Sequence, residues 1–191
     1  MTSSAIVEAS LDDLRSGDVR FLQEAAGYGQ LHVRVPSDAL VTETTGSPPS
    51  FPAVERLFLA QSLRWVQSAV IVEQPVVAAL PDLVAAGAAL VGREEDADAT
   101  LRAAADAAGV HCQLVSPTDR AGFPVIEPDL PLPDGPRVVV TGCYDWLHSG
   151  HIRFFMDAAA YGALYAVVGS DHNVALLKGA GPPQQRDQER R

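Results

Sequence analysis

The chain of 191 residues is 47% hydrophobic and 20% charged, which is the balance of a globular protein that buries a real core. Its formal net charge of −10 at pH 7 argues against a nucleic-acid-binding or anionic-membrane surface, because both need clustered Lys and Arg. A small anionic ligand is not excluded, since its site needs only a few local donors.

Strand and helix patterns alternate over residues 5–115. In chain order they predict an initial strand from Ala5, a helix over 17–28, a strand over 31–35, a loop over 46–52, a helix over 54–66, a strand over 69–72, a helical stretch over 75–86 interrupted at Pro81, a strand over 88–91, a helix over 96–108 and a strand over 110–115. The apolar stripe of the 54–66 helix is expected in the core: Val54, Leu57, Phe58, Leu63 and Val66. The alternation predicts an α/β, Rossmann-like fold, with a parallel sheet covered by helices on both faces.

A second strand–helix pattern follows a linker. Residues 116–136 are rich in Pro, Gly and Asp, which is typical of a connecting segment. Residues 138–141 then predict a new strand, which leads through a turn at 142–145 into an amphipathic helix ending near Tyr161.

The two patterns are copies of one another. Residues 5–41 align without a gap on residues 138–174, and sixteen of the 37 pairs are identical. Further on, Glu55-Arg56 matches Glu189-Arg190 after a one-residue shift. We therefore interpret the chain as a tandem duplication whose second copy stops less than halfway, and we expect it to be a fragment or truncation of a longer two-unit protein. The expected domains are a degenerate unit over 1–130 and the N-terminal part of a second unit over 131–191.

The start of the second helix carries the residues suited to chemistry. In an open parallel sheet, ligands bind at the carboxyl ends of strands, where helix N-termini favour phosphate. His148 and His151 are three residues apart, so they can share one face of the helix entrance and converge on a single anion. We expect Gly150 to clear space between them and Gly142 to let a phosphate approach the backbone. Two imidazole donors suit transfer at an α-phosphate, because the transition state spreads negative charge over phosphoryl oxygens.

The run G-C-Y-D-W-L-H-S-G-H from Gly142 to His151, followed by G-S-D-x-N-V-x-x-x-K-G, resembles the cytidylyltransferase-like branch of the nucleotidyltransferase superfamily. The tandem arrangement is most similar to the ethanolamine-phosphate enzymes of that branch. The resemblance implies that an NTP, with CTP favoured over ATP, is joined to a phosphorylated small-molecule acceptor. Pyrophosphate is released and Mg²⁺ assists. The family tendency also implies a homodimer.

The resemblance also implies roles for individual residues. His148 and His151 would contact the triphosphate and stabilise the transition state, and Lys178 would hold phosphate oxygens from a mobile loop. Asp145 and Asp171 would line the acceptor side. The remaining implied nucleotide contacts are Gly142, Cys143, Tyr144, Gly150 and Arg190. No residue is assigned as a metal ligand.

The residues alone leave alternatives open. Asp145 could only cap or orient its loop, and Asp171 could serve structure, because its counterpart Asp38 is retained in the first copy. Lys178 by itself is an ordinary loop charge. Cys143 is expected to be a packed residue and not a nucleophile, since nothing basic is placed to activate it.

The first copy is expected to be catalytically inactive. It has Arg15 and Asp18 at the positions of His148 and His151, and a carboxylate facing a triphosphate is repelled. We expect Asp18 to act as a helix N-cap instead. The family's second signature, which closes on the nucleotide, is absent from the second copy. Two classes therefore stay open: a nucleotidyltransferase, and a non-catalytic nucleotide-binding or assembly module.

The sequence also indicates the cellular compartment. Cys112 and Cys143 give no disulfide framework and no repeated metal-ligand spacing. The first 13 residues lack a basic segment followed by an apolar run, and no stretch of about 18 apolar residues exists. We expect a cytoplasmic protein that does not engage a membrane.

Overall fold

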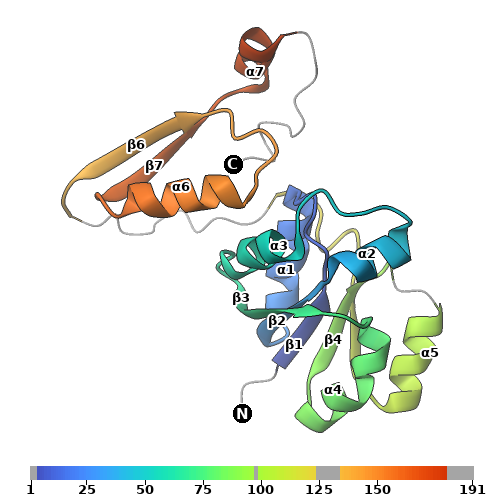
Figure 1. Ribbon diagram of the computed structural model, residues 1–191. Helices are drawn as coiled ribbons and strands as arrows, with labels where there is room; N and C mark the ends of the chain where they lie inside the picture. The colour runs from blue at the N-terminus through green and yellow to red at the C-terminus, as the bar shows by residue number, and fades with distance from the viewer. Residues whose placement is uncertain (1–3, 97–98, 124–133, 180–191) are drawn as a thin grey trace.

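The computed structural model describes residues 4–96, 99–123 and 134–179 (Figure 1). Five strands form a parallel sheet in the order β3-β2-β1-β4-β5: β1 (Ser4–Glu8), β2 (Gln30–Pro36), β3 (Val66–Val72), β4 (Ala89–Arg93) and β5 (Cys112–Val115). Two further strands, β6 (Arg137–Gly142) and β7 (Ala163–Val168), form a second parallel sheet. The chain thus has an α/β fold of the Rossmann-like type, as predicted.

Helices connect the strands. In the first unit they are α1 (Ser16–Ala26), α2 (Asp38–Thr45), α3 (Ala53–Gln61), the 3₁₀ turn η1 (Val76–Ala79), α4 (Leu80–Ala86) and α5 (Ala99–Ala108). In the second unit they are α6 (Ser149–Ala159) and α7 (Asp171–Lys178). None of the helices in the described residues is both long and apolar enough to cross a membrane.

Alternating side chains of the large sheet build a core on each face. Ala5 and Val7 of β1 pack in one apolar cluster with Phe21 and Leu22 of α1 and Leu59 of α3. The intervening Ile6 packs against the other cluster, which contains Leu80 and Leu83 of α4 and Ala105 of α5. Because successive side chains of a strand point to opposite faces, the strands contribute apolar residues to both clusters, and helices cover both faces of this sheet.

The segment β6-α6-β7 matches β1-α1-β2 position by position. Val138 pairs with Leu164 across β6 and β7, and their counterparts Ala5 and Leu31 pair across β1 and β2. Both segments have a non-glycine residue with positive φ before the helix, Leu11 at 56° and Tyr144 at 47°. Both helices begin with a reciprocal capping box, in which the side chain at the third helical position accepts the N-cap backbone N–H.

The two segments differ in how far their apolar side chains are buried. Phe21 of α1 is 3% exposed, whereas its counterpart Phe154 of α6 is 49% exposed. Within the described residues β6 pairs with β7 and with no equivalent of β4, the strand that flanks β1 in the large sheet. The second unit therefore presents apolar side chains that the first unit buries.

Three expectations about the elements were wrong. Helix α3 ends at Gln61, and β3 already begins at Val66, so the predicted helix ran on into the next strand. Val54 is 62% exposed and does not belong to the core stripe; Leu59 and Ala60 of the same helix are buried instead. The expected interruption at Pro81, by contrast, is confirmed: the helical stretch breaks at the junction of η1 and α4, where proline occupies the first turn of the new helix.

The third wrong expectation concerns the end of the second unit. Residues 171–178 form helix α7 and not a loop. Ser170 is its N-cap and accepts the backbone N–H of Asn173 at 3.3 Å, and its counterpart Ser37 caps α2 in the same way. Lys178 is therefore the last residue of a helix, and Arg190 lies outside the described residues.

Candidate functional site

His148 and His151 lie together at the entrance of α6. Their ring centroids are 4.1 Å apart and the ring planes are inclined by 32°. His148 is the N-cap, and its Nδ1 accepts the N–H of Gly150 at 3.1 Å. The backbone N–H of His148 in turn donates to Nδ1 of His151 at 3.4 Å. The sequence prediction that the two rings share one face of the helix entrance is confirmed.

This capping arrangement fixes the tautomer of both rings. A nitrogen that accepts a hydrogen bond carries no proton, so each neutral imidazole holds its proton on Nε2. Both Nε2–H groups then act as donors, beside the positive end of a helix. Such a pair of donors can stabilise an anion.

Gly150 is required by the neighbouring ring. A Cβ at this position would lie 2.8 Å from Cε1 and 3.0 Å from Nδ1 of His148, closer than Cβ contacts in real proteins. The expected clearance at Gly150 is therefore present, and it accommodates the His148 imidazole itself.

The space beside Gly142 is occupied by a side chain and not by the expected phosphate. A Cβ here would meet the ring of Tyr144 at 2.9 Å from Cζ, so the aromatic ring fills the space that we assigned to a phosphate. Tyr144 is 8% exposed and packs edge-on against His151, with centroids 5.5 Å apart, and against Phe155. The Tyr144 ring thus packs against the His151 ring, and the positive φ of Tyr144 makes this placement possible.

Burial also alters the chemistry of Tyr144. Its hydroxyl is buried and has no hydrogen-bond partner among the described residues. Desolvation of the phenolate raises the pKa of Tyr144 above its ordinary value. The ring therefore stays neutral over the physiological range.

A groove that is separate from the imidazole pair contains two of the predicted nucleotide contacts. This open groove of about 410 Å³ runs between the carboxyl ends of β6 and β7 and helix α7, and Gly142 and Cys143 line it. Its lining does not include either imidazole. Asp171 begins α7. The nucleotide roles of Cys143, Lys178 and Arg190 and the acceptor roles of Asp145 and Asp171 stay predictions.

The first unit has a cavity beside Asp18, the counterpart of His151. It measures about 430 Å³ and lies at the carboxyl ends of β1 and β4, where the strand order reverses. Asp18, the counterpart of His151, forms an ion pair there with Arg93 and accepts the backbone N–H of Arg15 at 2.7 Å. Asp18 is therefore the third helical residue of a capping box, with Arg15 as N-cap, and not the N-cap that we expected.

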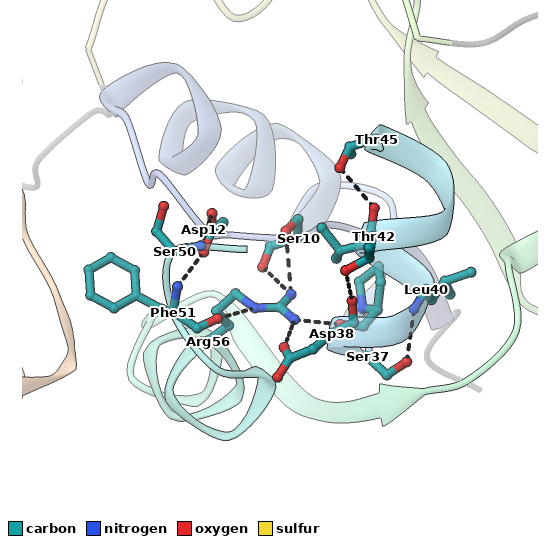
Figure 2. A network of polar contacts seen from close by, with 12 residues as sticks. Ser10, Asp12, Ser37, Asp38, Leu40, Thr42, Thr45, Ser50, Phe51 and Arg56 are labelled. Carbon is teal, nitrogen blue, oxygen red and sulfur yellow. Dashed lines mark hydrogen bonds and ion pairs between the residues drawn. The ribbon is translucent and has the colours of Figure 1, made fainter. Parts of the chain in front are cut away.

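Figure 2 shows the polar network that organises this unit around Arg56. The Arg56 side chain is fully buried. It donates to the carbonyl oxygens of Phe51, Ser10 and Pro36 at 2.8–3.1 Å and to a carboxylate oxygen of Asp38 at 2.7 Å. The first-unit counterpart of Asp171 thus has a structural partner, which favours the structural alternative for Asp38.

Sequence reasoning missed the residues of the first unit that reach the imidazole pair. The Phe51 ring lies 6.0 Å from the His148 ring and 5.4 Å from the Trp146 ring, between centroids. Glu55 of α3 forms a short hydrogen bond with the Ser149 hydroxyl and an ion pair with Arg153 at 2.8 Å. The matched pair Glu55-Arg56 and Glu189-Arg190 was the one signal in the sequence that pointed to this helix.

Glu55 is held in its charged form by these contacts. The hydrogen bond from Arg153 is the largest cause that lowers the pKa of Glu55, and the hydrogen bond from Ser149 adds to it, against the opposing effect of burial. The carboxylate is therefore ionised well below neutral pH, so the α3–α6 contact is charged under physiological conditions.

Comparisons with known proteins give a short match in sequence and a longer one in fold. No protein-family model matches the chain. A segment of 51 residues is 51% identical to the Bifunctional protein HldE of Hydrogenovibrio crunogenus and 49% identical to the proteins of that name from Methylococcus capsulatus and Shewanella denitrificans. Each match covers 26% of this chain, which spans 11% of the length of these relatives.

The structural match is with a lipopolysaccharide core biosynthesis protein from Thermoplasma volcanium. The TM-score is 0.50 at 21% sequence identity, and the match covers 61% of this chain and 96% of that protein. At this identity the likeness concerns the fold. The chain therefore shares a Rossmann-like α/β fold with this solved structure and has a short segment similar to the HldE proteins.

Proposed function

We propose that this chain belongs to the cytidylyltransferase-like nucleotidyltransferases. It joins an NTP, with CTP favoured over ATP, to a phosphorylated small-molecule acceptor and releases pyrophosphate. The observation that carries the proposal is the imidazole pair: two rings 4.1 Å apart at a helix N-terminus, with both Nδ1 atoms accepting backbone N–H groups. The segment similar to the HldE proteins and the resemblance of residues 142–179 to the family motif support it.

In the proposed reaction an oxygen of the acceptor phosphate attacks the α-phosphorus of the NTP, and the bond to the β-phosphate oxygen breaks. His148 and His151 donate through Nε2 to the phosphoryl oxygens, where negative charge increases in the transition state. The protein positions the reactants and neutralises charge, so no covalent nucleophile is needed. Among the described residues no group of three His, Cys, Asp or Glu side chains could hold a metal ion, and Mg²⁺ enters with the triphosphate as part of the substrate.

The test is pyrophosphate release from CTP and ATP in the presence of phosphorylated acceptors. The panel contains phosphorylated alcohols and sugar phosphates, the latter because the solved neighbour is named for lipopolysaccharide core biosynthesis. We expect His148→Ala and His151→Ala each to reduce turnover about 100-fold or more. His111→Ala is the control, because His111 is exposed in the first unit. Full turnover by both imidazole variants would refute the proposed roles.

A non-catalytic nucleotide-binding or assembly module is the second candidate. The observation that favours it is the incomplete cover of the second unit, where Val139, Val167 and Phe154 are 61%, 53% and 49% exposed. Isothermal titration separates the two classes. Binding of CTP without pyrophosphate release, whichever acceptor is present, supports the module. Absence of nucleotide binding excludes both the enzyme and a nucleotide-binding module.

A further inference from the structure

We propose that the first unit holds the imidazole pair of the second unit in place, with Phe51 and Glu55 as positioning residues for His148. The inference rests on the proposed function for its catalytic consequence, but the contact itself can be tested without nucleotide. It assigns a task to a unit whose own counterparts of the two histidines are Arg15 and Asp18.

The backbone of Phe51 is fixed from both sides. Its N–H donates to the Asp12 carboxylate at 2.8 Å, and the neighbouring N–H of Ser50 donates to the same carboxylate at 2.8 Å. Its carbonyl oxygen accepts from the buried Arg56 at 2.9 Å, as Figure 2 shows. A loop that is anchored at N–H and C=O by two charged groups presents its side chain in one direction.

The Phe51 ring points to the second unit and there meets two aromatic residues. It lies 6.0 Å from His148 at an inclination of 34° and 5.4 Å from Trp146 at 63°. The second neighbour of His148 is His151, whose ring centroid lies 4.1 Å from that of His148 at an inclination of 32°. His148 is thus placed between Phe51 and His151, and the three rings are only moderately tilted against one another. Removing Phe51 would leave His148 supported on one side.

Glu55 fixes the helix that carries the pair. Ser149 and Arg153 are four residues apart on α6, so they share one face, and the Glu55 carboxylate binds both. The Arg153 guanidinium also lies over the ring of Phe58, 4.3 Å from its centroid. Helix α3 therefore holds the first turn of α6 by a charged hydrogen bond and a cation–π contact. Figure 1 shows α6 lying next to α3.

Orientation of the imidazoles matters because hydrogen bonds to phosphoryl oxygens are directional. The Nδ1 caps set which nitrogen carries the proton, and the Phe51 contact limits the tilt of the ring about that cap. A donor that is already aligned loses little freedom when the nucleotide binds. In this proposal the first unit acts on the bound nucleotide through His148.

The structural test uses emission of Trp146 in a Trp65→Phe background, since the chain has two tryptophans. Phe51→Ala should shift and broaden the Trp146 emission and move the imidazole proton resonances of both His148 and His151. Phe51→Tyr should restore them, because the ring is retained. Tyr161→Ala removes an aromatic ring from the chain just after α6 that is 76% exposed, and serves as the control. Unchanged resonances and emission in Phe51→Ala would overturn the proposal.

The functional test compares nucleotide affinity with turnover. Phe51→Ala and Glu55→Gln should each weaken CTP binding and lower kcat by about tenfold, with recovery in Phe51→Tyr. Glu43→Gln, an exposed carboxylate on α2, is the control for Glu55. Loss of binding without recovery in Phe51→Tyr, or equal losses in Glu43→Gln, would overturn the positioning role.

Two outcomes keep this inference separate from the proposed function. If the parent chain binds no nucleotide, the proposed function fails, and the emission and histidine resonances still decide whether Phe51 orders the pair. If Phe51→Ala fails to fold, Glu55→Gln carries the same test, because it changes one side-chain atom and leaves the Arg56 network intact. Unaltered imidazole resonances in Glu55→Gln would then refute the inference.

Discussion

Replacing Arg56 by Met should destabilise the first unit by about 3 kcal/mol. The substitution keeps an unbranched apolar stem and removes the fully buried guanidinium. Three carbonyl acceptors, on Phe51, Ser10 and Pro36, then lose their donor, and each unsatisfied buried acceptor costs about 1–3 kcal/mol. The side chain of Asp38 is 51% exposed, so water solvates its carboxylate after the loss, and we therefore take the low end of the range for a broken buried pair.

The assay is urea unfolding followed by far-ultraviolet circular dichroism. Arg64→Met is the matched control, because Arg64 is exposed on the segment after α3 and should change stability by no more than about 0.5 kcal/mol. Arg56→Lys keeps the charge but not the planar fork of donors, so its loss should lie between those of the other two variants. A loss below about 1 kcal/mol for Arg56→Met would refute the reasoning from buried acceptors.

Three further predictions follow from the site. Gly150→Ala should displace the His148 ring and weaken nucleotide binding about tenfold. Gly17→Ala, at the matching position of α1, has nothing within 4 Å of its new Cβ and should leave both binding and stability intact. Equal behaviour of the two variants in calorimetric titration and thermal unfolding would show that the steric argument is wrong. Because the pKa of Glu55 is lowered in the folded state, its contribution is present above the unfolded value near 4.5 and is lost as pH falls through the lower folded pKa. The stability difference between the parent chain and Glu55→Gln should thus be under about 1 kcal/mol at pH 7, since Glu55 is partly exposed, and should shrink in acid; a difference that grows in acid would contradict this sign. Tyr144→Phe should be neutral or stabilising, as the buried hydroxyl has no partner among the described residues, and ultraviolet titration should show that it removes a phenol whose pKa lies above the ordinary tyrosine value.

The order of the elements could be predicted because each depends on local pattern. The alternation of apolar runs with helical periodicity predicted the strand–helix order of residues 4–115 except for helix α2, which was missed, and Pro81 marked the start of α4. The end of α3 was overestimated because Leu63 and Val66 continue the helical spacing by chance, although Ser62 already caps the helix. Helix α7 was missed despite a Ser-Asp start that matches the cap of α2.

The imidazole pair could be predicted because its two members are on one helix turn. Its surroundings could not, because they depend on contacts between distant segments. The ring of Tyr144 fills the space at Gly142 only because of an unusual backbone angle. Phe51, in the loop before α3, and Glu55 of α3 reach His148 and Ser149 from almost one hundred residues earlier in the chain. Sequence spacing carries no information about such pairs.

Two nearly equivalent strand–helix–strand segments in one polypeptide give the folding chain a choice of neighbours. The shared register would let β6 align beside β2 instead of β7, with every backbone hydrogen bond available. Local side-chain volume does not oppose this exchange, because Val140 would lie opposite Val33 just as its counterpart Val7 does in the native β1–β2 pair. Exchange of segments, within the chain or between molecules, is therefore the misfolding route that this architecture must suppress.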